Sequence, residues 1–414
     1  MGNLASRTDP LQRVEIFGYD QIGNPVERID RRGQRATRRY DPLNRLLETA
    51  FDDGSTIAYT YDGAGRLATV ADSLSGTITR TYDDLDRLTS EVTPQGTVNY
   101  SYDAAGRRST MTASNQPTIT YTYDAADRLT SLVQAGSTVT ITYDDADRRS
   151  TLTLPNGIVT SYGYDQADQL TSLGYTLGET SLGTLTYSYD AAGRRAEVGG
   201  TLARTSLPQG LASASYDVVN RLTQWGNAPL SSDANGNLSS DGLRSFTFDA
   251  RDQLSAVSGT APTGFAYDSL GRRIAVTVSG VSSNVLHDGV NAIAWQTGTT
   301  LATRLTGLEV DEWFAWSDSS GTVYPLRDAL GSTVALAAED GSVRTAFSYE
   351  PFGKSVVTGL QPASAPHGFT GREDDGSGLL YYRARYYDPT SGRFISEDPA
   401  EFDDDLNLFA YVGK

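Results

Sequence analysis

Apolar and hydroxyl-bearing residues alternate along much of this chain with a period of two. From Thr120 to Tyr123 aromatic rings alternate with threonine hydroxyls, and a second strand signal runs from Arg128 to Val133, ending at a glycine turn near Gly136. An alternation of this length is typical of a β-strand with one buried face. The four or five residues between the two runs are a turn, so the pattern predicts a β-hairpin.

This hairpin pattern recurs along the chain. Five Tyr-Asp pairs beginning with Tyr61 follow one another at intervals of 21, 20, 21 and 20 residues, and later pairs are spaced by 25, 27, 32 and 19 residues. The extra residues fall in Gly/Ser-rich stretches, as expected for insertions in loops. About a dozen units are anchored at Tyr19, Tyr40, Tyr61, Tyr82, Tyr102, Tyr123, Tyr143, Tyr164, Tyr189, Tyr216, Phe248 and Tyr267. Because a lone hairpin is marginally stable, we expect consecutive hairpins to pair edge to edge.

Each turn has its own chemistry. The Asp after each Tyr can accept hydrogen bonds from turn N–H groups, and the Gly, Asn or Asp that follows tolerates a positive φ. The next residue is usually Arg, a plausible ion-pair partner for the turn aspartates that contributes little if exposed.

Composition refines this prediction. Hydrophobic residues make up 38% of the 414 residues, so we expect a sheet largely one layer thick, wound into a coil, with its aromatic rows stacked along one face. A net charge of −17 argues against a nucleic-acid or anionic-membrane partner. No apolar run approaches the roughly 18 residues of a membrane span, and no signal peptide is visible. With no Cys and two His, no cofactor and no metal site are expected.

The repeats and the last third of the chain resemble the RHS/YD-repeat family. From His287 the pattern changes without becoming helical, and the first faint helix signal spans Asp404 to Tyr411. The matching segments are Asp288-Gly-Val-Asn291, Val310-Asp311-Glu312, Leu326-Arg-Asp328-Ala-Leu-Gly331-Ser332, Tyr349-Glu-Pro351-Phe352-Gly353, and Gly378-Leu-Leu-Tyr381-Tyr-Arg383-Ala-Arg385-Tyr386-Tyr387-Asp388-Pro389-Thr-Ser-Gly392-Arg393-Phe394-Ile395-Ser396-Glu-Asp398-Pro399.

The resemblance implies an all-β fold. An antiparallel hairpin strip would spiral into a hollow shell or part-shell over residues 1–284. Residues 285–414 would be the repeat-associated core, turning inward as a plug. Complete family shells usually have a longer N-terminal repeat region, so a fragment, an open half-shell and a miniature shell all stay open.

The implied function is to enclose or present a C-terminal toxin or effector polypeptide, in a bacterial protein that is secreted or lies at the cell surface. Its partners would be its own C-terminal effector segment, not contained in this sequence, and a second shell-forming protein. The alternative is an extracellular adhesion or carbohydrate-binding surface protein with glycans as partners. An ordinary hydrolase is a third hypothesis.

The resemblance also implies a self-cleavage region of aspartyl-protease type, the one enzymatic activity it suggests. Two carboxylates sharing a proton can cleave a peptide bond without metal or cofactor. The matching catalytic positions are Asp398 and Asp404, with Arg393 orienting or ionising one carboxylate. The competing interpretation is a turn at Asp398-Pro399 and a solvated acidic loop at Asp403 to Asp405.

Two departures from the family motif bear on cleavage. Relatives usually have Gly where this chain has Glu401 and Asp405, and Gly reaches backbone conformations that a side chain forbids. The chain also ends at Lys414, before the segment that contains the cut in relatives. We therefore expect that this chain does not cleave itself.

The other candidate sites have structural interpretations. His287-Asp288 suggests a catalytic dyad, but no nucleophile motif accompanies it, and His367 lies in a Pro/Gly-rich loop. The acidic run from Asp403 to Asp405 lacks the spacing of a calcium loop. No carboxylate pair points to a glycosidase. The tryptophans Trp295, Trp313 and Trp316 fit either sugar stacking or the plug.

Overall fold

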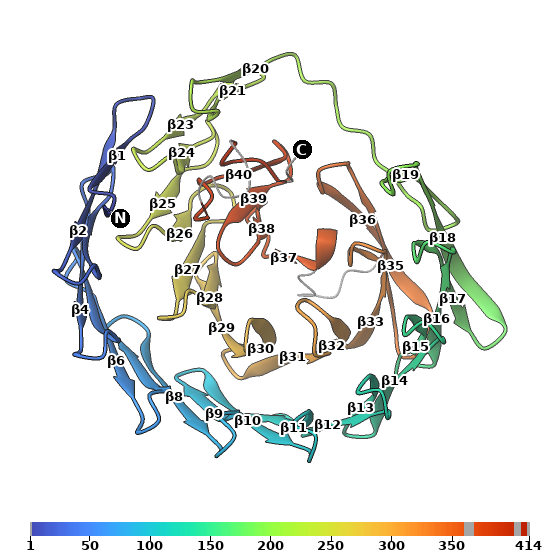
Figure 1. The fold of residues 1–414 in the computed structure, drawn as a ribbon. Coiled ribbons are helices and arrows are strands. Elements are labelled where there is room, and N and C mark those ends of the chain that lie inside the picture. Colours follow the sequence, from blue (N-terminus) through green and yellow to red (C-terminus); the bar gives the residue numbers. More distant parts are fainter. Residues whose placement is uncertain (1, 360–367, 401–406, 412–414) are drawn as a thin grey trace. The chain divides into compact units, whose positions relative to one another are not determined.

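The computed structural model describes residues 2–359, 368–400 and 407–411. Nearly every regular element in these residues is a β-strand, the exception being a single 3-10 turn, η1 (Phe369–Gly371), and the strand pairs along each strip are antiparallel. The all-β prediction and the antiparallel hairpin strip are therefore confirmed (Figure 1). The chain divides into two compact units, and each combines repeat segments with segments from the last third of the chain.

Unit 1 comprises Met1–Thr97, Gln209–Val285 and Asp375–Lys414. Its strands form a repeat strip (residues 6–93), two small sheets (residues 214–240), a second strip (residues 246–278) and a C-terminal group (residues 380–394). They are β1 (Ser6–Thr8), β2 (Val14–Tyr19), β3 (Pro25–Ile29), β4 (Arg35–Tyr40), β5 (Leu46–Phe51), β6 (Thr56–Tyr61), β7 (Leu67–Asp72), β8 (Gly76–Tyr82), β9 (Leu88–Thr93), β20 (Ala214–Tyr216), β21 (Leu222–Trp225), β22 (Ala228–Pro229), β23 (Ser231–Ser232), β24 (Leu238–Ser240), β25 (Phe246–Phe248), β26 (Leu254–Val257), β27 (Thr263–Tyr267), β28 (Arg273–Val278), β38 (Leu380–Tyr381), β39 (Tyr386–Asp388) and β40 (Arg393–Phe394).

Unit 2 comprises Val98–Pro208 and Leu286–Asp374. Two of its strands, β10 and β29, begin in the segments assigned to unit 1. The strands are β10 (Gly96–Tyr102), β11 (Arg108–Ala113), β12 (Ile119–Tyr123), β13 (Leu129–Gln134), β14 (Ser137–Tyr143), β15 (Arg149–Thr153), β16 (Ile158–Tyr164), β17 (Leu170–Leu177), β18 (Thr180–Tyr189), β19 (Arg195–Gly199), β29 (Val281–Asp288), β30 (Asn291–Thr297), β31 (Thr300–Thr306), β32 (Trp313–Asp318), β33 (Gly321–Arg327), β34 (Thr333–Ala337), β35 (Val343–Tyr349), β36 (Ser355–Gly359) and β37 (Glu373–Asp374). In this unit β10–β19 form the repeat strip and β29–β36 the second strip. The expected boundary between residues 284 and 285 falls inside β29 and stays a prediction.

The turns have the geometry that the sequence indicates. Asp62 Oδ1 accepts hydrogen bonds from the N–H groups of Ala64 and Arg66, both at 2.9 Å, and Oδ2 accepts one from Arg66 Nε at 2.7 Å. Gly65 has φ +86°, a conformation that favours glycine. The same carboxylate contacts recur at Asp83, Asp103, Asp124 and Asp144.

Repeat tyrosines in both units are bonded to the preceding hairpin. The hydroxyl of Tyr61 donates to the carbonyl of Leu46, and that of Tyr82 donates to Leu67, both at 2.9 Å. Tyr123, Tyr143 and Tyr164 make the same bond in unit 2. The bond crosses from one hairpin to the next, so the tyrosine row holds neighbouring hairpins in register.

The prediction of a sheet largely one layer thick is wrong. In unit 1, Arg251 of the second strip holds the buried Asp72 of the repeat strip through two hydrogen bonds of 2.6 and 2.8 Å. In unit 2, Arg108 of the repeat strip pairs with Asp288 at 2.6 Å. A second strip therefore covers one face of the repeat strip in each unit.

The physical reason for this error lies in how the aliphatic residues are distributed. A low overall content conceals that they occupy alternate positions on one face, where Ile57, Val70 and Ile78 are 6%, 1% and 2% exposed and pack together. A face of this kind must be covered to be stable in water.

The helix signal from Asp404 to Tyr411 was also misleading. In its described part, residues 407–411, the chain makes a turn with Ala410 N–H donating to the Asn407 carbonyl at 3.1 Å, and Ala410 forms a β-bridge with Arg393. Pairing with a neighbouring strand overrides the local helical pattern. In the part of the chain that the structure describes, none of the helices has the length and apolarity to cross a membrane.

Candidate functional site

The C-terminal segment of unit 1 is attached to the second strip of that unit. Arg273 forms an ion pair with Asp375 at 2.7 Å and lies 4.1 Å from the centre of the Tyr381 ring. The hydroxyls of Tyr267 and Tyr386 are hydrogen-bonded at 3.0 Å. Around these contacts lies an apolar cluster, hereafter the docking core, made of Leu238, Phe246, Leu254, Val257, Phe265, Tyr267, Val276, Leu379, Tyr381, Tyr386 and Ile395. A buried core shared between the strip and residues 379–395 fixes this segment in place.

Arg393 lies in β40, beside the docking core. Its guanidinium lies 5.1 Å from the centre of the Tyr216 ring and 5.6 Å from that of Phe409. It donates to the backbone carbonyl of Asn220 and, at 3.2 Å, to Asn407 Oδ1. Burial lowers the pKa of Arg393. Arg393 therefore ties the C-terminal segment to residues 216–220.

Asp398 is held by a different arginine. The guanidinium of Arg385 pairs with Asp398 Oδ2 at 2.5 Å, while Asp398 Oδ1 accepts the N–H of Ala400 at 3.0 Å. Arg385 also lies 3.7 Å from the centre of the Phe394 ring. Burial lowers the pKa of Arg385, and the charge of Asp398 opposes that shift.

The structure does not pair the two predicted site residues that it describes, because Asp398 contacts Arg385 and Arg393 contacts Asn220 and Asn407. Arg393 and Asp398 both lie in the C-terminal segment of unit 1, and Asp404, like Asp403 and Asp405, lies outside the described residues. Sequence reasoning missed Arg385, although it stands within the quoted Arg383-Ala-Arg385 motif. The ion pair with Arg385 holds the Asp398 carboxylate in place.

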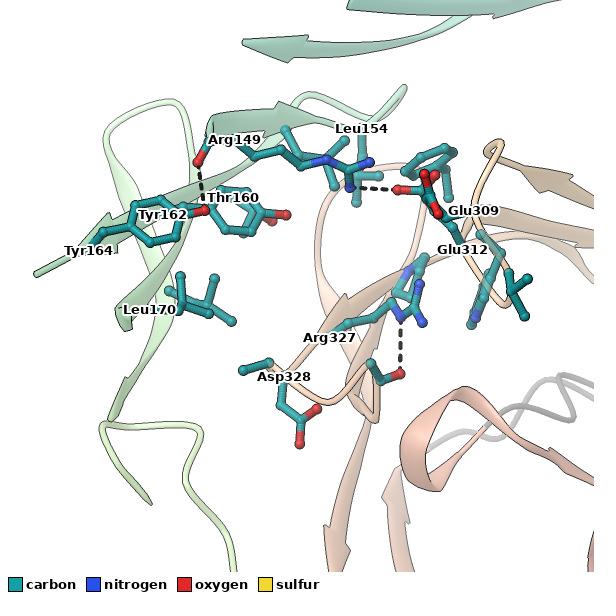
Figure 2. Close-up of a pocket in the computed structure, with 18 residues that line it drawn as sticks. Arg149, Leu154, Thr160, Tyr162, Tyr164, Leu170, Glu309, Glu312, Arg327 and Asp328 are labelled. Atoms are coloured by element: carbon teal, nitrogen blue, oxygen red, sulfur yellow. Dashed lines mark hydrogen bonds and ion pairs between the residues drawn. The ribbon is translucent and has the colours of Figure 1, made fainter. Parts of the chain in front are cut away.

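Unit 2 contains a cavity of about 530 Å³ that sequence reasoning did not identify (Figure 2). One wall belongs to β15, β16 and β17, and the other to the segment before β32 and the end of β33. Its lining residues are Arg149, Leu152, Leu154, Thr160, Tyr162, Tyr164, Leu170, Leu173, Glu309, Val310, Glu312, Trp313, Phe314, Pro325, Arg327, Asp328, Ala329 and Gly331.

The charged groups of this cavity differ in their surroundings. Arg149 pairs with Glu312 at 2.5 Å, and that contact raises the pKa of Arg149 against the effect of burial. Within the described residues Arg327 donates to two backbone carbonyls, those of Gly331 at 3.1 Å and Asp311 at 2.9 Å, and burial lowers its pKa. Burial raises the pKa of Asp328, whose Oδ1 accepts the N–H groups of Leu330 and Ser332.

The other sequence candidates have structural roles. The carboxylate of Asp288 accepts hydrogen bonds from the Tyr100 hydroxyl at 2.7 Å and from Arg108, so its contacts are those of an ion pair between strips. Trp295 and Trp316 are buried with ring centres 4.8 Å apart, and Arg304 lies 4.5 Å from the centre of Trp295. Among the described residues no group of three His, Asp or Glu side chains is placed to hold a metal ion. His367 lies outside the described residues.

Comparison with known proteins finds a matching family profile and similar bacterial proteins. The sequence profile of the teneurin YD-shell matches residues 15–194 and 156–280. The tRNA3(Ser)-specific nuclease WapA of Bacillus spizizenii is 29% identical over 213 residues, which are 48% of this chain and 9% of WapA. The double-stranded DNA deaminase toxin A of Burkholderia cenocepacia is 28% identical over 247 residues, 48% of this chain and 17% of the toxin.

A solved structure extends the similarity to the whole fold. The crystal structure of TcdB2-TccC3-Cdc42 superposes with a TM-score of 0.78 over 99% of this chain and 27% of that one, at 17% sequence identity. At this identity the similarity concerns the fold. The chain spans less than a tenth of the WapA relative and about a quarter of the solved chain.

Proposed function

Because the chain belongs to the teneurin YD-shell family, we propose that it forms wall and plug of a container that encloses or presents a C-terminal effector polypeptide. Residues 1–284 are the wall and residues 285–414 the repeat-associated core. The observation that carries this proposal is the docking core, through which residues 379–395 are packed into the second strip of unit 1. A C-terminal segment anchored in this way would hold the start of an attached effector at a fixed position.

The names of the relatives support a toxic or enzymatic effector. They include a tRNA nuclease and a DNA deaminase toxin, and this chain covers only 9% and 17% of those two proteins. We infer that the effector is a separate segment, that the protein is secreted or lies at the cell surface, and that a second shell-forming protein is a further partner.

The proposal includes a self-cleavage region of aspartyl type. Asp398 and Asp404 are its carboxylates, Arg393 positions one of them, and Arg385 holds Asp398 in place through an ion pair. Glu401 and Asp405 replace the usual glycines, so the 414-residue chain is expected to keep its intact mass on storage. A time-dependent C-terminal loss that disappears in Asp398→Asn and persists in Asp388→Asn would contradict this expectation.

A protection experiment tests the container itself. A flexible, protease-sensitive peptide is fused after Lys414, and the same peptide is fused before Met1 as the matched control. If the C-terminal segment delivers its continuation into an enclosure, trypsin should cleave the N-terminal fusion rapidly and the C-terminal fusion at least tenfold more slowly. Equal cleavage rates at both ends would refute the enclosure and favour the adhesin interpretation.

A further inference from the structure

Unit 1 contains a smaller cavity, of about 260 Å³, between its repeat strip and its second strip. One wall comes from β3 to β6, and the other from the turns that follow β25 and β27. Arg38 lies on the first wall, in β4. It stands opposite Thr49, which stands opposite Ile57, so these three side chains share one face of the strip. Ile57 is 6% exposed within the apolar cluster of that face, so Arg38 is a charge on the covered side of the strip.

The charge of Arg38 is not compensated by the protein in the way that the neighbouring charges are. Arg38 is half-buried and forms neither a hydrogen bond nor an ion pair with a described residue. Its nitrogens are not among the enclosed polar atoms that lack a partner, so they are open to solvent at the cavity that Arg38 lines. The other arginines of the lining each have a carboxylate partner: Arg28 has Glu15, Arg35 has Glu27 and Arg251 has Asp72.

The acidic side chains of the lining already have arginines beside them. They are Asp30 and Asp252, at 3.6 and 3.1 Å from Arg32, and Asp268, at 2.7 Å from Arg272. None of these carboxylates is therefore free to neutralise Arg38. A partly desolvated charge is stabilised by an opposite charge close to it, so the cavity favours an anion.

The charge balance and the size of the cavity narrow the class of anion. One uncompensated positive charge beside three aspartates fits a monoanion, whereas a dianion such as phosphate would be repelled by the carboxylates. A carboxylate matches the guanidinium, because its two oxygens can accept two parallel N–H groups. The volume of about 260 Å³ lies just below the roughly 300–1,000 Å³ of sites for drug-sized ligands, so a small molecule fits.

Gln253 offers a second, neutral donor in the same cavity. It occupies the turn position at which most repeats carry Arg, and its backbone N–H donates to Asp249 Oδ1 at 2.9 Å. Its side-chain amide lines the cavity and has no hydrogen-bond partner among the described residues. A hydroxyl oxygen next to a carboxylate can accept a hydrogen bond from this amide.

We propose that this cavity binds a small hydroxylated monocarboxylate, with the carboxylate on the guanidinium of Arg38 and the hydroxyl oxygen on the amide of Gln253. The assignment depends on the two strips of unit 1 and is independent of the container function.

The test is saturation-transfer NMR on the full 414-residue chain with glycolate and lactate. Glycolamide and lactamide are the neutral probes of the same size. Inorganic phosphate, added as a competitor, tests a dianion. A pentapeptide of small neutral residues with a free C-terminal carboxylate tests whether the carboxylate belongs to a polypeptide.

Arg38→Gln removes the charge and keeps a side-chain amide. Arg39→Gln is the matched control, because Arg39 is the next residue of β4, is 67% exposed, pairs with Glu48 at 3.0 Å and does not line the cavity. Both substitutions change the net charge equally. Since Arg38 has no carboxylate partner and the pair of Arg39 is exposed, both variants should keep the thermal unfolding midpoint of the wild-type chain.

The expected result is saturation transfer to at least one of the two acids and not to its amide, at least a tenfold loss of affinity in Arg38→Gln and no loss in Arg39→Gln. Binding that survives Arg38→Gln would place the ligand elsewhere and overturn the assignment. Equal binding of acid and amide, or tighter binding of phosphate, would overturn the ligand class. Binding of the peptide alone would overturn the small-molecule source, and failure of both acids to bind the wild-type chain would overturn the proposal.

Discussion

The guanidinium of Arg107 lies 4.6 Å from the centre of the Tyr123 ring, although the two residues belong to consecutive hairpins. The same guanidinium pairs with Asp103 of its own turn and with Asp127 of the next turn, both at 2.7 Å. Arg66, Arg128 and Arg148 repeat this set of contacts. Each exposed ion pair is weak, but together with the ring contact they form a ladder that links successive hairpins.

The tyrosine row should contribute measurably to stability. Tyr123→Phe removes the hydroxyl that donates to the Arg108 carbonyl at 2.7 Å, and we expect the free energy of unfolding to fall by about 1 kcal/mol. Tyr121→Phe on the same strand is the control, because the Tyr121 hydroxyl is buried without a hydrogen-bond partner among the described residues. Urea unfolding measures both. Equal losses would show that the interhairpin bond does not contribute.

The turn aspartates should make the stability of the folded protein sensitive to acid. Hydrogen bonds from Arg107, Arg128 and Arg148 lower the pKa of Asp103, Asp124 and Asp144. A folded-state pKa below the unfolded value of about 3.9 gives stability that is present above that value and lost as pH falls through the folded pKa. We therefore expect the urea midpoint to be steady above about pH 5 and to drop below about pH 4.

The matched control is the triple variant of these three aspartates to Asn. Because Asn does not titrate, its midpoint should be lower at neutral pH and change less between pH 5 and pH 3. An acid dependence as steep as that of the wild-type chain would mean that other carboxylates cause it.

The ion pairs between strips should be costly to break from one side. Arg108→Leu leaves Asp288, whose side chain is 5% exposed, without its cation, and we expect a loss of about 3 kcal/mol in the free energy of unfolding. Arg108→Leu combined with Asp288→Leu should recover most of it, since no buried charge is then left unpaired. Arg194→Leu, in a pair whose arginine is 81% exposed, should have no measurable effect. A double variant no better than Arg108→Leu would contradict this interpretation.

Substitutions at two turn glycines separate the destabilisation caused by backbone strain from that caused by a steric clash. Gly136 and Gly341 have φ values of +86° and +78°, so alanine is strained at both by about 1–2 kcal/mol. At Gly341 a Cβ atom would also lie 2.3 Å from Leu177, whereas nothing lies within 4 Å at Gly136. We expect Gly341→Ala to be the more destabilising by thermal unfolding. Equal effects would mean that Leu177 moves aside freely.

Much of the fold was accessible from the sequence because it is local. A Tyr-Asp pair at a regular spacing fixes the turn, the strand pairing and the tyrosine row, all of which join residues within about twenty positions. The contacts between the repeat strip and the second strip are not local in this sense. Asp288 and Arg108 lie 180 residues apart, and nothing near either identifies its partner among 51 acidic and 34 basic residues.

The sequence nevertheless contains a signal for the contacts with the second strip. The residue after the repeat arginine is Leu at positions 46, 67, 88 and 129 but Arg at 108, 149, 195 and 273. A charge at that position favours a buried partner. Arg195 lies 4.6 Å from the centre of the Tyr187 ring. Arg108, Arg149 and Arg273 pair with Asp288, Glu312 and Asp375. At the C-terminal site the motif indicated Asp398, but the choice of Arg385 over Arg393 depends on how the segment folds back.

The ladder and the ion pairs between strips set different constraints on repeat number. Each rung contacts only its neighbours, so the repeat strip by itself could gain or lose whole units of about twenty residues. In unit 2, however, Arg108 and Arg149 are 41 residues apart, and their partners Asp288 and Glu312 are 24 residues apart on the second strip. Deleting one unit between the two arginines would leave the remaining rungs able to form but would displace one ion pair from its partner. Insertions and deletions in this part of the chain must therefore occur in both strips together.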